Sequence, residues 1–239
     1  MSAAPAPVGL FIVLEGLDGS GKDTVLDQCF RMFYLEQKHN SQNPMFISKY
    51  QNVLRTREPT MSSSAGIHLA AMLSGLTLLN HQEDALRLYV EDRRQHSAFI
   101  RQCKSHRIAV LCSRYDLSTY AYQHVMGFSL DEIYSQHSYS AVDGCLIPDL
   151  TLFFDLDAET AVGRIKSSGR QIEALESYEF LSKTRIAYLK SIDFLKKKDN
   201  RDIAVINASQ SPDDVAAEAC RTIGKKIESF NSRKTRSAG

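Results

Sequence analysis

The chain has 239 residues, of which 43% are hydrophobic and 24% are charged, as is ordinary for one globular domain. Its 29 lysines and arginines nearly balance 28 acidic residues, which argues against a bulk attraction to nucleic acid or to an anionic membrane. No apolar run is long enough to span a bilayer, and the five cysteines form no C-x-x-C pair. We therefore expect a cytoplasmic protein with reduced cysteines.

The two ends of the chain differ in composition from the middle. Residues 1–8 are rich in Ala and Pro and lack the basic and apolar regions of a signal peptide, which predicts a flexible arm. Residues 231–239 predict a flexible basic tail. Residues 9–230 between them predict a single domain.

Apolar runs and helical spacing predict the following elements in chain order. The first half contains a strand at 10–15, a helix at 22–34, a strand at 53–57, a helix ending at 73, a long helix at 83–104, a strand at 108–112 and a helix at 116–125. The second half contains a strand at 150–155, helices at 158–165 and 176–197, a strand at 203–206 and a helix at 212–227.

A glycine-rich loop, G-L-D-G-S-G-K, follows the first strand from Gly16 to Lys22. Such a loop turns its backbone N–H groups around a phosphate, and its lysine reaches the transferring phosphates. A Ser or Thr normally follows this lysine and holds Mg²⁺, but here Asp23 follows it, with Thr24 one position later. The candidates for binding ATP phosphates are Gly16, Gly19, Ser20, Gly21, Lys22, Asp23 and Thr24.

Strands that alternate with helices, together with this loop, predict an α/β fold of the P-loop NTPase type. We expect a doubly wound sheet of about five parallel strands with helices on both faces and a short lid. Ligands in such folds bind at the carboxyl ends of the strands. The motifs described below all follow strands or open helices near that edge, so one cleft could hold them together.

Four further segments resemble the thymidylate kinase family. They are T-R-E-P at 56–59, L-Y-V-E-D-R-R-Q-H at 88–96, S-R-Y-D-L-S-T-Y-A-Y-Q at 113–123 and P-D-L-T-L-F-F-D-L-D at 148–157. The loop alone indicates only a nucleotide-binding protein, whereas the set, spread over residues 9–220, is specific. The form is similar to the bacterial one, since Gly19 stands where other members carry a catalytic arginine.

The resemblance implies ATP-dependent phosphorylation of dTMP to dTDP with Mg²⁺ as cofactor. It also implies a homodimer built from packed helices, for which the helix at 83–104 is a candidate face. A kinase of another nucleotide or nucleoside would share the fold and the loop. A non-catalytic nucleotide-binding protein is a further alternative, because two positions depart from the family pattern.

The candidate dTMP site combines residue chemistry with the resemblance. Arg57 and Arg114 follow strand ends, where guanidinium groups can clamp the acceptor phosphate, although each could instead form a surface ion pair. The resemblance implies that Tyr89 stacks on thymine and that Arg93 reaches its O4 carbonyl. It places other candidates near the base edge, the sugar and the 3′-hydroxyl. The full set is Asp18, Arg57, Tyr89, Arg93, Arg114, Ser118, Thr119, Tyr122 and Gln123.

The polar segment 164–173 stands where the family has its lid. Because Gly19 replaces the loop arginine, the resemblance implies that a lid arginine acts on the transferring phosphate. Arg170 is the first choice and Arg164 the second, against the alternative of exposed loop charges. The catalytic candidates are then Lys22, Arg114, Arg170 and Arg164.

Two departures from the family pattern are reciprocal. Asp23 replaces a hydroxyl residue, and Ser113 replaces the aspartate before Arg114. In many phosphate-loop enzymes these two positions lie near each other and serve Mg²⁺. Our hypothesis is an exchanged pair that keeps one hydroxyl and one carboxylate at the metal. The alternative is that the changes are independent and damage Mg²⁺ binding.

Overall fold

The computed structural model describes residues 9–39, 52–76, 82–169 and 174–236. Its centre is a five-stranded sheet in the order β2-β3-β1-β4-β5, in which every pairing is parallel. The strands are β1 (Phe11–Gly16), β2 (Asn52–Arg57), β3 (Ile108–Ser113), β4 (Leu150–Asp155) and β5 (Ile203–Asn207). The predicted fold class and all five predicted strands are confirmed.

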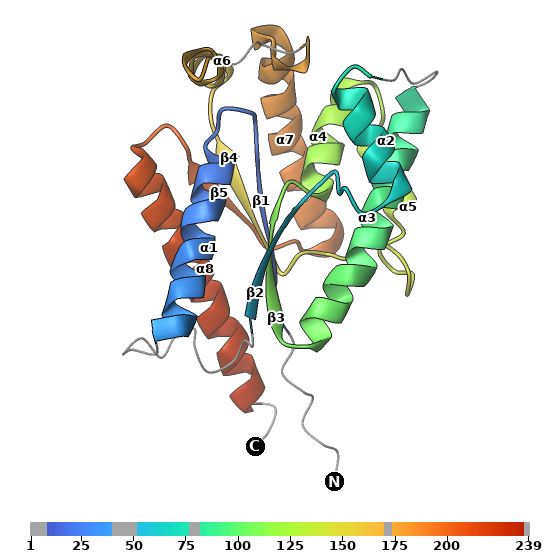
Figure 1. Cartoon of the computed structure of the whole chain (residues 1–239). Helices are drawn as coiled ribbons and strands as arrows, with labels where there is room; N and C mark the ends of the chain where they lie inside the picture. The colour runs from blue at the N-terminus through green and yellow to red at the C-terminus, as the bar shows by residue number, and fades with distance from the viewer. Residues whose placement is uncertain (1–8, 40–51, 77–81, 170–173, 237–239) are drawn as a thin grey trace.

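Helices cover both faces of this sheet. They are α1 (Lys22–His39), α2 (Ser64–Leu73), α3 (Gln82–Ser105), α4 (Asp116–Val125), α5 (Leu130–His137), α6 (Ala158–Ser167), α7 (Tyr178–Asp199) and α8 (Pro212–Arg236), with a 3-10 turn η1 (Ala174–Glu176). Figure 1 shows α1 and α8 on one side of the sheet and α3, α4 and α7 on the other. No helix among the described residues is long and apolar enough to cross a membrane.

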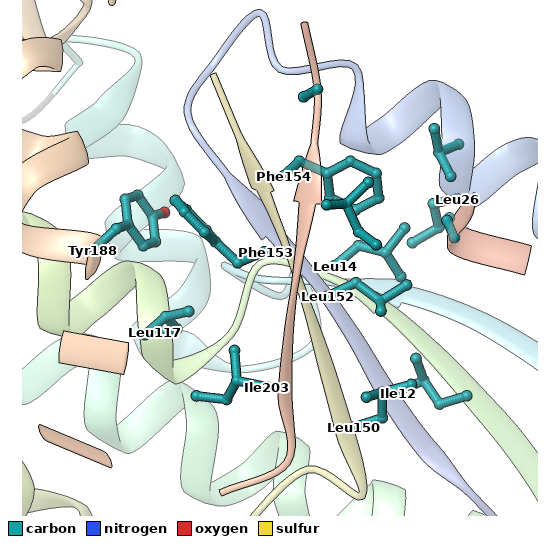
Figure 2. Close-up of a cluster of buried hydrophobic side chains, with 14 of the residues drawn as sticks. Ile12, Leu14, Leu26, Leu117, Leu150, Leu152, Phe153, Phe154, Tyr188 and Ile203 are labelled. Carbon is teal, nitrogen blue, oxygen red and sulfur yellow. The ribbon is translucent and has the colours of Figure 1, made fainter. Parts of the chain in front are cut away.

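The three central strands, β1, β3 and β4, are buried almost throughout, because helices cover both faces of the sheet and successive side chains point to opposite faces. Figure 2 shows Phe154 and Leu14 on the side of Leu26, which belongs to α1. Phe153 points the other way and packs on Tyr188 of α7, with 4.9 Å between ring centroids. Packing on both faces holds the strands in place, and the candidate site is built at their carboxyl ends.

Four segments differ from the sequence-based expectation. Helix α5 (Leu130–His137) was not predicted, and α1 extends to His39. Helix α6 continues to Ser167, so the first residues of the predicted lid, 164–167, are helical. Helix α8 continues to Arg236, because the basic segment after Gly224 contains no Gly or Pro to end it. The predicted arm 1–8 and Arg170 lie outside the described residues.

Candidate functional site

A cavity of about 230 Å³ opens where three strands end, beside the glycine-rich loop. Gly16 ends β1, Arg57 ends β2 and Ser113 ends β3, and β1, β3 and β2 are neighbours in the sheet. All nine residues predicted to bind dTMP line this cavity: Asp18, Arg57, Tyr89, Arg93, Arg114, Ser118, Thr119, Tyr122 and Gln123. The structure thus brings together side chains that are up to 105 positions apart in the sequence (123 minus 18).

The loop has room for no side chain at Gly19. Its φ is +80°, and a Cβ atom there would lie 2.6 Å from the carbonyl oxygen of Ala161 in α6. An arginine at this position would therefore require both an unfavourable backbone conformation and a displaced helix. Any arginine that acts on the transferring phosphate must come from another segment.

Lys22 is held between two carboxylates at the start of α1. Its Nζ lies 3.6 Å from Asp18 Oδ1 and 3.4 Å from Asp23 Oδ2, and its side chain is only 3% exposed. Burial lowers the pKa of Lys22, as does the nearby Arg114, whereas Asp18 and Asp23 raise it. Bound phosphates would supply further negative charge to the same ammonium group.

The two residues that depart from the family pattern are in contact. Ser113 Oγ donates a hydrogen bond to Asp23 Oδ1. Partial burial raises the pKa of Asp23, but Lys22, the Ser113 hydroxyl and Arg114 together bring it below its ordinary value. Asp23 is consequently ionised at neutral pH, and 71% of its side chain is exposed at the mouth of the loop.

These oxygens fit a Mg²⁺ ion. Mg²⁺ prefers hard oxygen ligands and is commonly bound through one or two protein groups, with substrate phosphates and water completing the shell. The Asp23 carboxylate and the Ser113 hydroxyl supply such a pair beside the loop lysine. The described residues contain no group of three or more His, Cys, Asp or Glu that could hold a metal by itself.

Arg114 has an unusual backbone conformation and a charged partner. Its φ is +60°, in the left-handed region that non-glycine residues rarely adopt. Its Nη2 donates to Asp18 Oδ1 at 2.6 Å, and its Nη1 donates to Ser118 Oγ at 3.3 Å. Such strain is concentrated at functional sites, where the surrounding structure over-determines it. Arg114 lines the cavity together with both of these partners.

Arg93 is buried and makes several hydrogen bonds inside the protein. Its Nε and Nη2 donate to Glu58 Oε2 at 2.9 and 2.6 Å, and Nη2 also contacts Thr119 Oγ1 at 3.0 Å and the Tyr115 carbonyl oxygen at 2.9 Å. Its Nη1 donates to His137 Nε2 at 2.8 Å. Glu58 and His137 were not predicted as site residues. Glu58 stands in the T-R-E-P motif, a signal that could have identified it.

The remaining walls of the cavity are aromatic and amide side chains. The Arg114 guanidinium carbon lies 5.6 Å from the ring centroid of Tyr122, and burial raises the pKa of Tyr122 to about 12. Tyr89 lines the cavity from α3. Gln123 Oε1 is buried and has no hydrogen-bond partner among the described residues. A buried amide oxygen of this kind is available to a ligand donor.

Glu15 anchors the start of α4 and was missed by sequence reasoning. It is fully buried, and it accepts hydrogen bonds from the Tyr115 and Ser118 backbone N–H groups and from the Ser118 hydroxyl. Burial raises the pKa of Glu15, although these bonds and Arg114 oppose the increase. Ser118, a predicted dTMP contact, is therefore tied to Glu15 and to the Tyr188 hydroxyl.

Arg164, the second-choice catalytic arginine, lies in α6. Its Nη1 donates to the carbonyl oxygen of Gly19 at 3.4 Å, and its Nη2 donates to that of Ala208 at 3.1 Å. It thus braces the phosphate loop against the segment after β5. Glu176, at the end of η1, also lines the cavity.

Comparison with known proteins agrees with this geometry. The model of the thymidylate kinase family matches residues 14–219. The chain is 29% identical over 225 residues to a thymidylate kinase of Bacillus cereus (strain B4264), and 30% identical over 226 residues to one of Bacillus cytotoxicus. Each match covers 92% of this chain and 99% of the relative.

Proposed function

Because the chain belongs to the thymidylate kinase family, we propose that it transfers the γ-phosphoryl group of ATP to dTMP, forming dTDP and ADP. The observation that carries this proposal is the single cavity lined by all nine predicted dTMP residues beside the phosphate loop. In the reaction, an oxygen of the dTMP phosphate attacks the γ-phosphorus in line while the bond to the ADP oxygen breaks. No strong general base is needed, because the attacking phosphate is already anionic.

Arginines and the loop lysine neutralise charge in this reaction. We assign the acceptor phosphate to Arg57 and Arg114, whose guanidinium groups line the cavity at two adjacent strand ends. Guanidinium forks bind phosphate oxygens with two parallel hydrogen bonds. Lys22 lies at the donor side, where it contacts the transferring phosphate. Catalysis then comes from positioning and charge stabilisation.

The hydrogen-bonding groups suit thymine better than cytosine. A thymine edge presents a carbonyl oxygen at C4 and an N–H at N3, whereas cytosine presents an amine and an unprotonated nitrogen. We assign the C4 carbonyl to an Arg93 N–H and the neighbouring N–H to Gln123 Oε1, with Tyr89 as a stacking partner. Thr119, which is bonded to Arg93, borders the same edge. As the family resemblance implies, we assign the sugar 3′-hydroxyl to Asp18, and we place Tyr122 beside the sugar, where it helps to exclude a 2′-hydroxyl.

The Mg²⁺ that accompanies ATP would be held by Asp23 and Ser113, through the exchanged pair described above. Bound there, the ion supplies positive charge to the β- and γ-phosphates. Asp23 presents its carboxylate to this position because Ser113 and Lys22 fix its two oxygens. Arg170 stays our first choice for the lid arginine that acts on the transferring phosphate. Arg164 is second, because its guanidinium already donates to two backbone carbonyls.

The family resemblance also supports a cytoplasmic homodimer. None of the five cysteines, all of which lie within the described residues, forms a disulfide, as expected in a reducing compartment. For the dimer face we propose α3, on which the side chain of Phe99 is 47% exposed.

Initial-rate assays with Mg-ATP and each of dTMP, dUMP, dCMP and dGMP test the proposal. We expect ADP release with dTMP and much slower release with dCMP and dGMP. Preference for another nucleotide would favour a different nucleotide kinase. Nucleotide binding without any ADP release would favour a non-catalytic binding protein.

A further inference from the structure

We propose that His137 is a positioning residue, which holds Arg93 so that one N–H of its guanidinium faces the base of the bound nucleotide. This inference rests on the proposed function and extends it to a residue outside the cavity. His137 does not line the cavity, and it acts only through the 2.8 Å hydrogen bond from Arg93 Nη1 to its Nε2.

The argument begins with the donors of Arg93. A guanidinium carries five N–H groups. Nε and Nη2 are satisfied by Glu58, by the Tyr115 carbonyl and by Thr119, so Nη1 is the nitrogen left to meet a ligand. One N–H of Nη1 is accepted by His137, and no residue in the described segments accepts the other. That second N–H is the donor left for a ligand.

His137 is suited to accept because its ring is neutral in a defined tautomer. Its Nδ1–H donates to the carbonyl oxygen of Ile133 at 2.7 Å, so Nε2 carries the lone pair. Burial, aided by the positive charge of Arg93, lowers the pKa of His137 to about 3. A protonated ring would direct a donor toward another donor and would break the bond to Arg93 Nη1.

The imidazole is also prevented from rotating. It is sandwiched between Tyr120 and Tyr139, with ring centroids 5.3 and 5.2 Å away and interplanar angles of 11° in both pairs. The backbone carbonyl of His137 accepts from the Cys145 N–H at 3.0 Å, which fixes the end of α5. Because the imidazole cannot rotate, its Nε2 holds the Arg93 guanidinium in one position.

The functional consequence is selectivity. A single N–H donor held rigidly in a buried site favours binding of a pyrimidine with a carbonyl at C4 and disfavours one with an amine there. If the whole guanidinium could tilt or shift, the same arginine would discriminate less between thymine and cytosine. His137 therefore contributes to the choice of base without touching it.

Two substitutions separate this role from a purely structural one. In His137→Gln, the side-chain carbonyl oxygen can occupy the place of Nε2 and accept from Arg93. In His137→Asn, the shorter amide can replace only Nδ1 and donate to Ile133. We expect the KM for dTMP to rise about tenfold in the Asn variant, as is typical of a lost hydrogen bond to a charged group, and to change little in the Gln variant. The KM for ATP should stay unchanged in both.

The control is His106→Gln. His106 makes a similar bond from Nδ1 to the carbonyl of Gln102, four residues earlier, but lies exposed at the end of α3. The His106→Gln variant should leave the KM values for dTMP and for ATP unchanged. Equal KM values for dTMP in the Gln and Asn variants, or an unchanged ratio of dTMP to dCMP turnover in the Asn variant, would overturn the proposal.

Calorimetric measurement of dTMP binding without ATP tests the positioning role of His137 separately from the proposed kinase activity. Wild-type protein that binds dTMP without phosphorylating it would overturn the kinase assignment alone, and absence of binding would overturn both. Nitrogen-15 NMR of the histidines in the wild-type protein serves if the variants fail to fold. The neutral Nδ1–H tautomer of His137 is expected at neutral pH, and an imidazolium there would refute the positioning role.

Discussion

Ser113 Oγ donates a hydrogen bond to Asp23 Oδ1, although the two residues are 90 positions apart in the chain. Each is a departure from the family pattern, and each carries the chemical group that the other position normally has. Their contact means that one hydroxyl and one carboxylate are still present beside Lys22. The contact supports the hypothesis of an exchanged pair over that of two independent lesions.

Three variants test the exchange: Asp23→Ser, Ser113→Asp and the double variant. The first removes the only carboxylate of the pair, and the second places two carboxylates within contact, where their repulsion raises the pKa of one. We expect each single variant to need about tenfold more Mg²⁺ for half-maximal activity and the double variant to recover most of the loss. Activity is measured against Mg²⁺ concentration.

Binding of Mn²⁺ in the presence of ADP, followed by electron paramagnetic resonance, gives a readout that does not depend on turnover. Weaker Mn²⁺ binding in both single variants and recovery in the double variant would support the exchange. Single variants that behave like the wild type in both measurements would contradict the hypothesis of an exchanged pair.

Two arginines on β2 offer a matched pair for the acceptor phosphate. Arg57 lines the cavity, whereas Arg55 pairs with Asp27 at the surface. Arg57→Ala should lower kcat/KM for dTMP by about 30- to 100-fold, equivalent to about 2–3 kcal/mol for lost charge-assisted hydrogen bonds. Arg55→Ala should leave it within about twofold, because exposed ion pairs contribute little. Equal losses in both variants would show that strand integrity, and not phosphate contact, explains the effect.

The residues that sequence could predict are those with a local signal. The helix at Asp116–Val125 and the strand at Leu150–Asp155 have the predicted bounds, because apolar spacing and flanking residues mark them. Helix α5 was missed, although Ser129 and Glu132 form a capping box that a search for S-x-x-E would have found. His137 lies at the end of that helix, so its bond to Arg93 could not be predicted without the helix. Such a contact joins segments 44 residues apart and leaves no local pattern.

Two glycines near α6 should respond oppositely to alanine. Gly163 lies in the middle of α6, and a Cβ atom there would meet nothing within 4 Å. Gly163→Ala should therefore stabilise the protein by about 0.5–1 kcal/mol, because alanine loses less backbone entropy on folding. Gly19→Ala should destabilise it and weaken ATP binding, because of its φ of +80° and the close Ala161 carbonyl.

Thermal and urea unfolding measure both glycine variants, and calorimetry measures ATP binding. Stabilisation by Gly19→Ala would show that α6 does not rest on the loop as the structure has it. Loss of stability in Gly163→Ala would show that this face of α6 is covered, for example by the partner in a dimer.

The buried His137 should make stability depend on pH. Its pKa falls from an ordinary 6.5 to about 3, because burial and the charges of Arg93 and Arg201 outweigh the opposing charge of Asp116. Between these values the unfolded chain binds the proton and the folded chain does not, so the free energy of unfolding rises with pH across this window. From about pH 7 to about pH 4, the wild type should lose about 3 kcal/mol more than His137→Gln, which has no such proton. Urea unfolding of both proteins at several pH values measures the difference, and parallel profiles would contradict a neutral, buried His137.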